Sequence, residues 1–140
     1  MEPAPTRKPI VDVDPFDLPE WLGVGQVVWH ADRGLRSGHL VAGRLVCGDD
    51  VLACDLLAVD EAYPAPVTDD DSRLRAHQSW RHGQVLLGTY GDRLVLAVPG
   101  TRFDAELVLD TLSRLARAVG GSPDNMGALL RIGAEKQNRR

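Results

Sequence analysis

Residues 84–119 constrain the fold most, because they combine a β-hairpin with the amphipathic helix that follows it. Two apolar runs flank Gly91-Asp92, a pair typical of a two-residue hairpin turn, since glycine adopts the positive φ that such turns require. Pro99-Gly100 then ends the second strand. Thr101 and Asp104 have the spacing of a capping box, which predicts that a helix begins here.

One face of this helix is apolar over its whole length. The residues that form it recur at spacings of three and four, the period of a helix that packs against a core: Phe103, Leu107, Val108, Leu112, Leu115, Ala116 and Val119. Gly120-Gly121 ends the helix. Ser122-Pro123 is an N-cap followed by proline at the first helical position, which predicts a short helix through about Arg131.

Three further strands are predicted upstream, over 24–31, 39–47 and 51–59. Gly43 inside the second strand indicates a bulge or a close contact. The third strand has apolar residues on both faces apart from Asp55, and such runs are typical of strands covered on both sides, by helices or by a second subunit.

A helix over 69–82 completes the set of elements, with Thr68 and Asp71 at capping-box spacing and Gly83 after its last turn. The order βββ-α-ββ-α-α predicts an α+β fold with one mainly antiparallel sheet of about five strands and helices covering one face. We expect a single domain over 21–132 and a polar C-terminal tail over 133–140.

Residues 1–20 contain five of the nine prolines, which excludes a helix there and predicts an extended or disordered arm. Four apolar residues mark the point where this arm meets the domain: Phe16, Leu18, Trp21 and Leu22. The sequence leaves open whether the arm packs on its own domain or on a neighbouring one.

The composition is that of a globular protein, with 44% hydrophobic and 26% charged residues. No apolar run approaches the roughly 18 residues of a membrane span, and no secretory signal is visible, so we expect a cytoplasmic protein. Cys47 and Cys54 flank a predicted hairpin turn at a separation too large for a disulfide, which predicts two free thiols. Arginine supplies nearly all the positive charge, a bias typical of a G+C-rich bacterial genome.

Charge is distributed unequally along the chain. Residues 1–70 carry 13 acids and 5 bases, whereas residues 71–140 carry 7 acids and 11 bases. Either the two halves attract each other within the fold, or the basic half faces an acidic partner.

The densest polar and aromatic cluster lies on the helix over 69–82: Arg73, His77, Trp80 and Arg81. It is a candidate docking face for an acidic partner protein or for phosphate, with Trp80 as the anchor and the arginines as donors. In the alternative interpretation, Trp80 is a core residue that holds a surface helix and the arginines are solvated.

A second candidate site combines three histidines with a carboxylate: His30, His39, His77 and Asp55. Asp55 in an apolar strand requires a partner, either Arg44 or a histidine, or a raised pKa. The histidines and cysteines lack the close pairs that zinc sites use, so we expect no metal and no cofactor.

No phosphate-binding loop, dinucleotide fingerprint or catalytic motif occurs in the sequence. The leading prediction is therefore a small non-catalytic protein–protein interaction or regulatory module that self-associates or binds another protein. The alternative is a small-molecule-binding domain or metal-independent enzyme whose site lies near His30, His39, Asp55 and His77. Nucleic-acid binding has little support, because the chain is acidic overall and has few aromatic residues.

Overall fold

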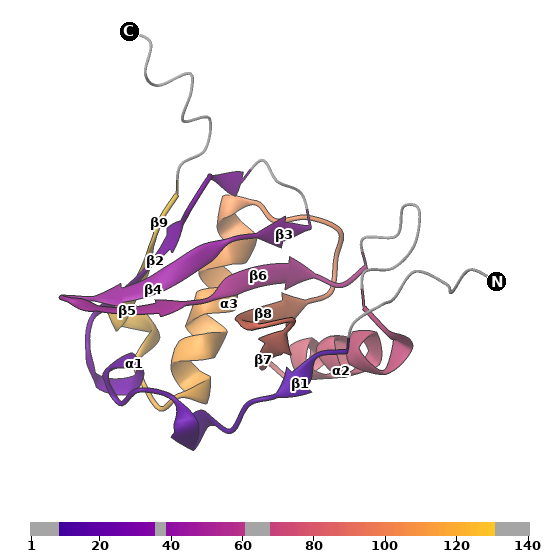
Figure 1. Ribbon diagram of the computed structural model, residues 1–140, viewed down its shortest axis with the longest axis horizontal. Helices are drawn as coiled ribbons and strands as arrows, with labels where there is room; N and C mark the ends of the chain where they lie inside the picture. The colour runs from indigo at the N-terminus through magenta and orange to yellow at the C-terminus, as the bar shows by residue number, and fades with distance from the viewer. Residues whose placement is uncertain (1–8, 36–38, 61–67, 131–140) are drawn as a thin grey trace, which may run out of the picture.

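The computed structural model describes residues 9–35, 39–60 and 68–130 of the chain, and Figure 1 shows the arrangement of its elements. The predicted tail over 133–140 and residues 1–8 of the predicted arm lie outside the described residues. In chain order the elements are β1 (Val11–Asp12), η1 (Pro15–Asp17), α1 (Trp21–Val24), β2 (Val27–Ala31), β3 (Leu40–Val41), β4 (Gly43–Cys47), β5 (Asp50–Ala53), β6 (Asp55–Ala58), α2 (Asp70–Arg81), β7 (Leu86–Tyr90), β8 (Arg93–Val98), α3 (Ala105–Ala118), η3 (Pro123–Asn125) and β9 (Met126–Leu129).

The described strands form two sheets, so the α+β class is confirmed and the prediction of one sheet is wrong. One sheet has five strands in the order β1-β7-β8-β6-β3, and the other has four in the order β5-β4-β2-β9. Both sheets are mixed, because β6 pairs with β8 in parallel and β2 pairs with β9 in parallel. The remaining pairs are antiparallel.

A long bent hairpin joins the two sheets (Figure 1). Its arms pass from one sheet into the other at Ala42, between β3 and β4, and at Cys54, between β5 and β6. At the bend, a Cβ on Gly43 would lie 2.3 Å from the ring of Trp29, so this strand passes the indole at a distance that only glycine permits. The close contact predicted for Gly43 is confirmed. Strand alternation continues through the bend, so the sequence pattern does not reveal the change of sheet.

Both faces of the five-stranded sheet are covered within the chain. On one face, Leu57 and Val95 belong to a buried cluster with Ala76 of α2. On the other, Leu56 belongs to the larger core that includes Leu112 of α3 and the inward side of the four-stranded sheet. The prediction that helices cover only one face is therefore wrong, because each helix takes a different face.

The hairpin and helix that organise the sequence are present as predicted. β7 and β8 pair in antiparallel through a turn in which Gly91 has a φ of 67°, and α3 follows. Asp104, rather than Thr101, is the N-cap of α3, and its side chain accepts a hydrogen bond from the Leu107 N–H. At α2 the cap is also later than predicted, by one position, because Asp69 rather than Thr68 accepts a hydrogen bond from the Ser72 N–H.

The chain after α3 differs most from the prediction. The predicted short helix through about Arg131 is wrong. Ser122 caps a single turn, η3, and the chain then extends as β9 beside β2. Met126 and Ala128 alternate with outward residues and pack against the core. Their burial in a strand overrides the local start signal, because period-two alternation suits a sheet and one helical turn has little stability of its own.

The described part of the N-terminal segment lies along the five-stranded sheet. Ile10 is 2% exposed, and its N–H donates to Ser72 Oγ of α2 at 2.9 Å. β1 pairs with β7 beside Gly88, where an added Cβ would lie 2.5 Å from the Val11 carbonyl oxygen. Further along, Leu22 is buried in α1, so the chain meets the larger core there.

Candidate functional site

Asp55 lies at the bend of the hairpin, as the first residue of β6, and is 5% exposed. Its carboxylate accepts hydrogen bonds from Arg93 Nε at 2.7 Å and Arg93 Nη2 at 2.9 Å, and from the Gly43 N–H at 3.1 Å. The expected ion partner was Arg44 or a histidine; the partner is Arg93, which is 38 positions away in sequence. Parallel pairing of β6 with β8 brings the two residues together.

An open hollow of about 500 Å³ lies beside this ion pair, lined by Asp32, Arg33, Leu40, Ala42, Asp55 and Arg93. Arg44 forms a separate ion pair with Asp32 across the antiparallel strands. Three of the four charged residues that line the hollow, Asp32, Asp55 and Arg93, are therefore paired within the fold. This arrangement suits a structural role at the bend, and it leaves the side chain of Arg93 46% exposed.

The predicted docking cluster on α2 makes contacts inside the molecule. His77 Nε2 lies 2.9 Å from Asp60 Oδ2, and Arg73 Nη2 lies 3.5 Å from Asp60 Oδ1. Asp60 also accepts from the Gly100 N–H at 2.9 Å. Burial by itself would raise the pKa of Asp60, but the hydrogen bonds from Gly100 and His77, with the positive charge of Arg73, lower it below its usual value.

Trp80 and Arg81 lie at the other end of α2 and have different surroundings. Trp80 is half-buried against the larger core, and the Arg114 guanidinium of α3 stacks 3.4 Å from the centre of its ring. Arg114 Nη1 also donates to the Trp80 carbonyl oxygen at 2.7 Å. Arg81 is exposed. Of the four predicted docking residues, three therefore attach α2 to the rest of the fold.

The residues of the alternative pocket lie in separate contacts. His77 bonds Asp60, whereas Asp55 bonds Arg93 and Gly43. His30 lies opposite Arg44 in the β2–β4 pair, and the carbonyl oxygen of His39 accepts from the Ala58 N–H. Within the described residues, no group of three or more histidine, cysteine, aspartate or glutamate side chains is placed to hold a metal ion.

Both cysteines are free thiols, as predicted. Cys54 is fully buried, and desolvation with the nearby negative charge of Asp55 raises the pKa of its thiol far above the usual range. Cys54 is therefore a core residue rather than a nucleophile, because a thiol reacts as its thiolate. Cys47, next to the turn of the hairpin, is half-buried.

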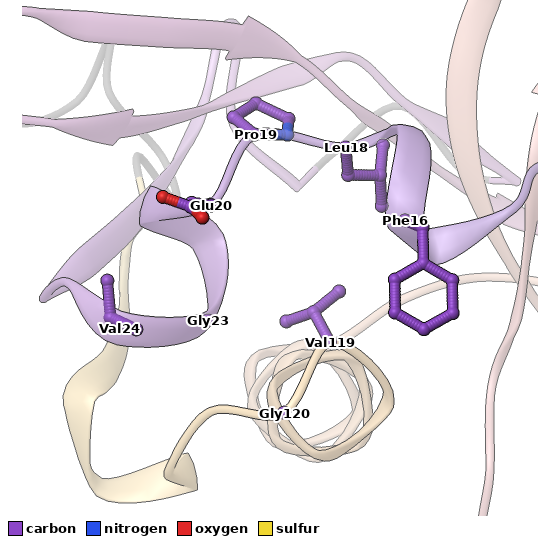
Figure 2. Close-up of a pocket in the computed structure, with 8 residues that line it drawn as sticks. All are labelled: Phe16, Leu18, Pro19, Glu20, Gly23, Val24, Val119 and Gly120. Atoms are coloured by element: carbon purple, nitrogen blue, oxygen red, sulfur yellow. The ribbon is translucent and has the colours of Figure 1, made fainter.

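A hollow of about 420 Å³ with a mixed polar and apolar lining lies where η1 and α1 meet the end of α3, as Figure 2 shows. Its lining is Phe16, Leu18, Pro19, Glu20, Gly23, Val24, Val119 and Gly120. Phe16 is 94% exposed and Val24 is 80% exposed, on either side of Val119 in Figure 2. Of the four residues predicted to anchor the arm, Leu22 is buried while Phe16 projects into solvent.

The position of this hollow follows from one close contact. A Cβ on Gly23 would lie 2.5 Å from the Val119 carbonyl oxygen, so glycine allows α1 to pack directly on the end of α3. Phe16 is held on a turn in which the Asp14 carboxylate accepts from the Phe16 N–H at 3.0 Å and the Asp14 carbonyl oxygen accepts from the Asp17 N–H at 2.8 Å.

Sequence reasoning missed two features, the Arg93 partner of Asp55 and the exposure of Phe16. The acids on either side of Pro15-Phe16 are the signal that indicates a surface turn rather than an anchor. No helix among the described residues is both long and apolar enough to cross a membrane. No family model, curated protein or solved structure matches this chain.

Proposed function

We propose that this chain is a non-catalytic protein-interaction module that docks a partner in the hollow beside Phe16. The observation that carries the proposal is the 94% exposure of Phe16 beside a hollow that Val24, itself 80% exposed, also lines. Burying an aromatic side chain of this size contributes about 1.5–3 kcal/mol, and aromatic residues dominate the energetics of protein interfaces. A partner that covers Phe16 and Val24 gains this contribution without any rearrangement of the core.

The charge around the hollow indicates the chemistry of the partner. Glu20 lies in the lining, and Asp14 and Asp17 lie on either side of Phe16 in sequence. The hollow also receives the C-terminal end of α3, which carries partial negative charge. These features favour a partner segment with an apolar side chain next to a lysine or arginine. They differ from the basic α2 cluster, whose Arg73 and His77 are engaged with Asp60.

The polar clusters support a non-catalytic role. In the Asp55–Arg93 and Asp60–His77 pairs, each polar side chain bonds another group of the same fold. Both pairs join segments far apart in sequence, which is what a structural ion pair does.

The test is recovery of partners from source cells by the tagged full-length chain, compared with Phe16→Ser and Leu74→Ser. Leu74 is a matched control, because it is an exposed apolar residue on α2 away from the hollow. We expect a stoichiometric partner to be recovered with the wild type and with Leu74→Ser, and to be lost with Phe16→Ser. The purified partner should then bind the wild type and Leu74→Ser with similar affinity and Phe16→Ser much more weakly. Equal recovery with all three chains, or no partner with any, would contradict the proposal.

The small-molecule alternative has one supporting observation, the charged hollow at the bend. Its volume of about 500 Å³ lies within the range of ligand sites, and its lining includes Asp55 and Arg93. It contains none of the three histidines of the predicted pocket. A thermal-shift screen with small carboxylates and phosphates tests it, since a ligand of this hollow should raise Tm in the wild type and fail to do so in Arg93→Ala.

A further inference from the structure

β5 is an open edge of the four-stranded sheet. It lies at the end of the order β5-β4-β2-β9, and among the described residues no strand pairs with its outer side. Asp50, Val51 and Ala53 are exposed, with Val51 at 59%. Edge strands of monomeric proteins are usually blocked by lysine, proline or a bulge. β5 has the sequence Asp-Val-Leu-Ala and carries only one charge, at its first residue.

The hairpin turn fixes which backbone groups of β5 face outward. Gly48, with a φ of 62°, and Asp49 form a two-residue turn, so Cys47 and Asp50 are a hydrogen-bonded pair and every second pair after them is too. The Cys54 N–H donates to the Gly43 carbonyl oxygen at 3.0 Å, in agreement with this alternation. The N–H and C=O groups of Val51 and Ala53 therefore point away from β4, toward the open edge.

We propose that two copies of this chain associate by antiparallel pairing of β5 with β5, with Leu52 opposite Leu52 and Val51 opposite Ala53. A two-fold axis between the two β5 strands places one residue directly opposite the same residue of the other copy, with both side chains on one face. We compare the register in which this residue is Leu52 with the register in which it is Val51. The register centred on Leu52 forms four hydrogen bonds, because Val51 and Ala53 of each copy bond Ala53 and Val51 of the other. The register centred on Val51 forms two between the strands.

Charge at the two ends of β5 favours the antiparallel direction. Asp49 and Asp50 lie at the turn end. At the bend end, Arg33, Arg44 and Arg93 outnumber Asp32 and Asp55, the carboxylates with which Arg44 and Arg93 are paired. Antiparallel pairing brings the acids of each copy toward the arginines of the other, whereas parallel pairing brings acids toward acids. This self-complementarity is the reason for naming a second copy as the occupant of the edge.

The paired segment is short, so the dimer belongs to the class of weak interfaces that bury less than about 1,200 Å². Measurement therefore requires protein concentrations up to several hundred micromolar. The inference shares with the proposed function only the assumption that the chain is a protein-interaction module. It involves a different surface from the Phe16 hollow, so Phe16→Ser should leave self-association unchanged.

Sedimentation velocity of the full chain over a concentration series is the first test. Ala53→Pro removes an outward N–H that β4 does not use, and Val51→Lys places a charge at the edge. We expect reversible dimerisation of the wild type and a dissociation constant at least about tenfold higher in each variant. The control is Leu74→Lys, at a site that is 55% exposed on α2, which should dimerise as the wild type does. A wild type that stays monomeric, or edge variants that still dimerise, would overturn the proposal.

Disulfide cross-linking tests the register, because cysteine substitutions leave the outward backbone N–H and C=O groups of β5 free to pair. In a Cys47→Ser background, Leu52→Cys places two thiols opposite each other with Cα atoms about 4.5 Å apart, within disulfide range. Val51→Cys is the matched control, since this residue is more exposed but faces Ala53 of the other copy. We expect a covalent dimer from Leu52→Cys and little from Val51→Cys. The reverse yield, or no cross-link from either, overturns the pairing.

Discussion

Asp60 is the residue on which the contacts of α2 with the rest of the fold converge. It follows β6, accepts a hydrogen bond from the Gly100 N–H after β8, and lies against His77 and Arg73 of α2. Its side chain is 24% exposed. These partners all favour the carboxylate over the acid, so its lowered pKa means that ionisation of Asp60 stabilises the folded state.

Asp60→Asn should therefore lower the free energy of unfolding by about 1–2 kcal/mol at pH 7. The stabilisation is fully present above the unfolded-state pKa of about 4 and is lost as the pH falls through the lower folded-state pKa. Denaturant unfolding at several pH values should show the wild type and variant converging below pH ~4. Asp110→Asn, at an exposed site, is the control. A difference that stays constant down to pH ~2 would show that ionisation of Asp60 contributes nothing.

Gly43→Ala tests the contact at the bend. The added Cβ would lie 2.3 Å from the Trp29 ring and 2.6 Å from the His30 carbonyl oxygen, so either the strand or the indole must move. We expect a loss of about 1–3 kcal/mol in urea unfolding, the usual cost of overpacking. Gly127→Ala in β9 of the same sheet is the matched control, since its Cβ would meet nothing within 4 Å. Equal stability of the two variants would refute the steric argument.

At the scale of elements, the sequence predicted what short-range signals determine. The turn at Gly91 and the apolar period of residues 103–119 each depend on residues only a few positions apart, and both produced the expected structure. The bend at Gly43 and the conversion of 126–129 into β9 depend on Trp29 and β2, which are distant in sequence. Alternation alone carries no information about these long-range pairings.

The same distinction applies to the candidate sites. The sequence indicated that Asp55 needs a partner, because a carboxylate in an apolar strand is costly without one. It did not identify Arg93, since the contact depends on the parallel register of β6 with β8. The acids beside Phe16 indicate a surface turn, but the hollow next to it depends on how α1 packs on α3, which no local pattern reports.

Arg93→Ala tests the ion pair that joins β8 to the bend. It leaves the nearly buried Asp55 with the Gly43 N–H as its remaining donor. We expect unfolding to become easier by about 1–3 kcal/mol, at the lower end of buried pairs because Arg93 is 46% exposed. Arg44→Ala is the control, since its pair with Asp32 is exposed and should contribute less than about 1 kcal/mol. Equal losses would mean that burial of Asp55 does not matter.

At the scale of the molecule, the charge asymmetry of the sequence is used inside the fold. Acids of the first half pair with bases of the second: Asp12 with Arg75, Asp55 with Arg93, and Asp60 with Arg73 and His77. These contacts support attraction between the halves over an acidic external partner. They also engage Arg73, Arg75 and His77 of α2 within the fold.

The five-stranded sheet separates two buried clusters, so the molecule should unfold as one unit. Ile10 belongs to the cluster beneath α2, whereas Trp29 belongs to the larger core on the other side of the sheet. Ile10→Ala should cost about 2–4 kcal/mol. Tryptophan fluorescence reports the larger core, because Trp29 lies in it and Trp21 and Trp80 pack against it. Since β6, β7 and β8 contribute to both clusters, the fluorescence and circular dichroism transitions should shift together to lower denaturant. Leu129→Ala, at a site that is 54% exposed, should shift neither. If the fluorescence transition stays at its wild-type midpoint while the dichroism transition moves, the two cores are separate units of stability.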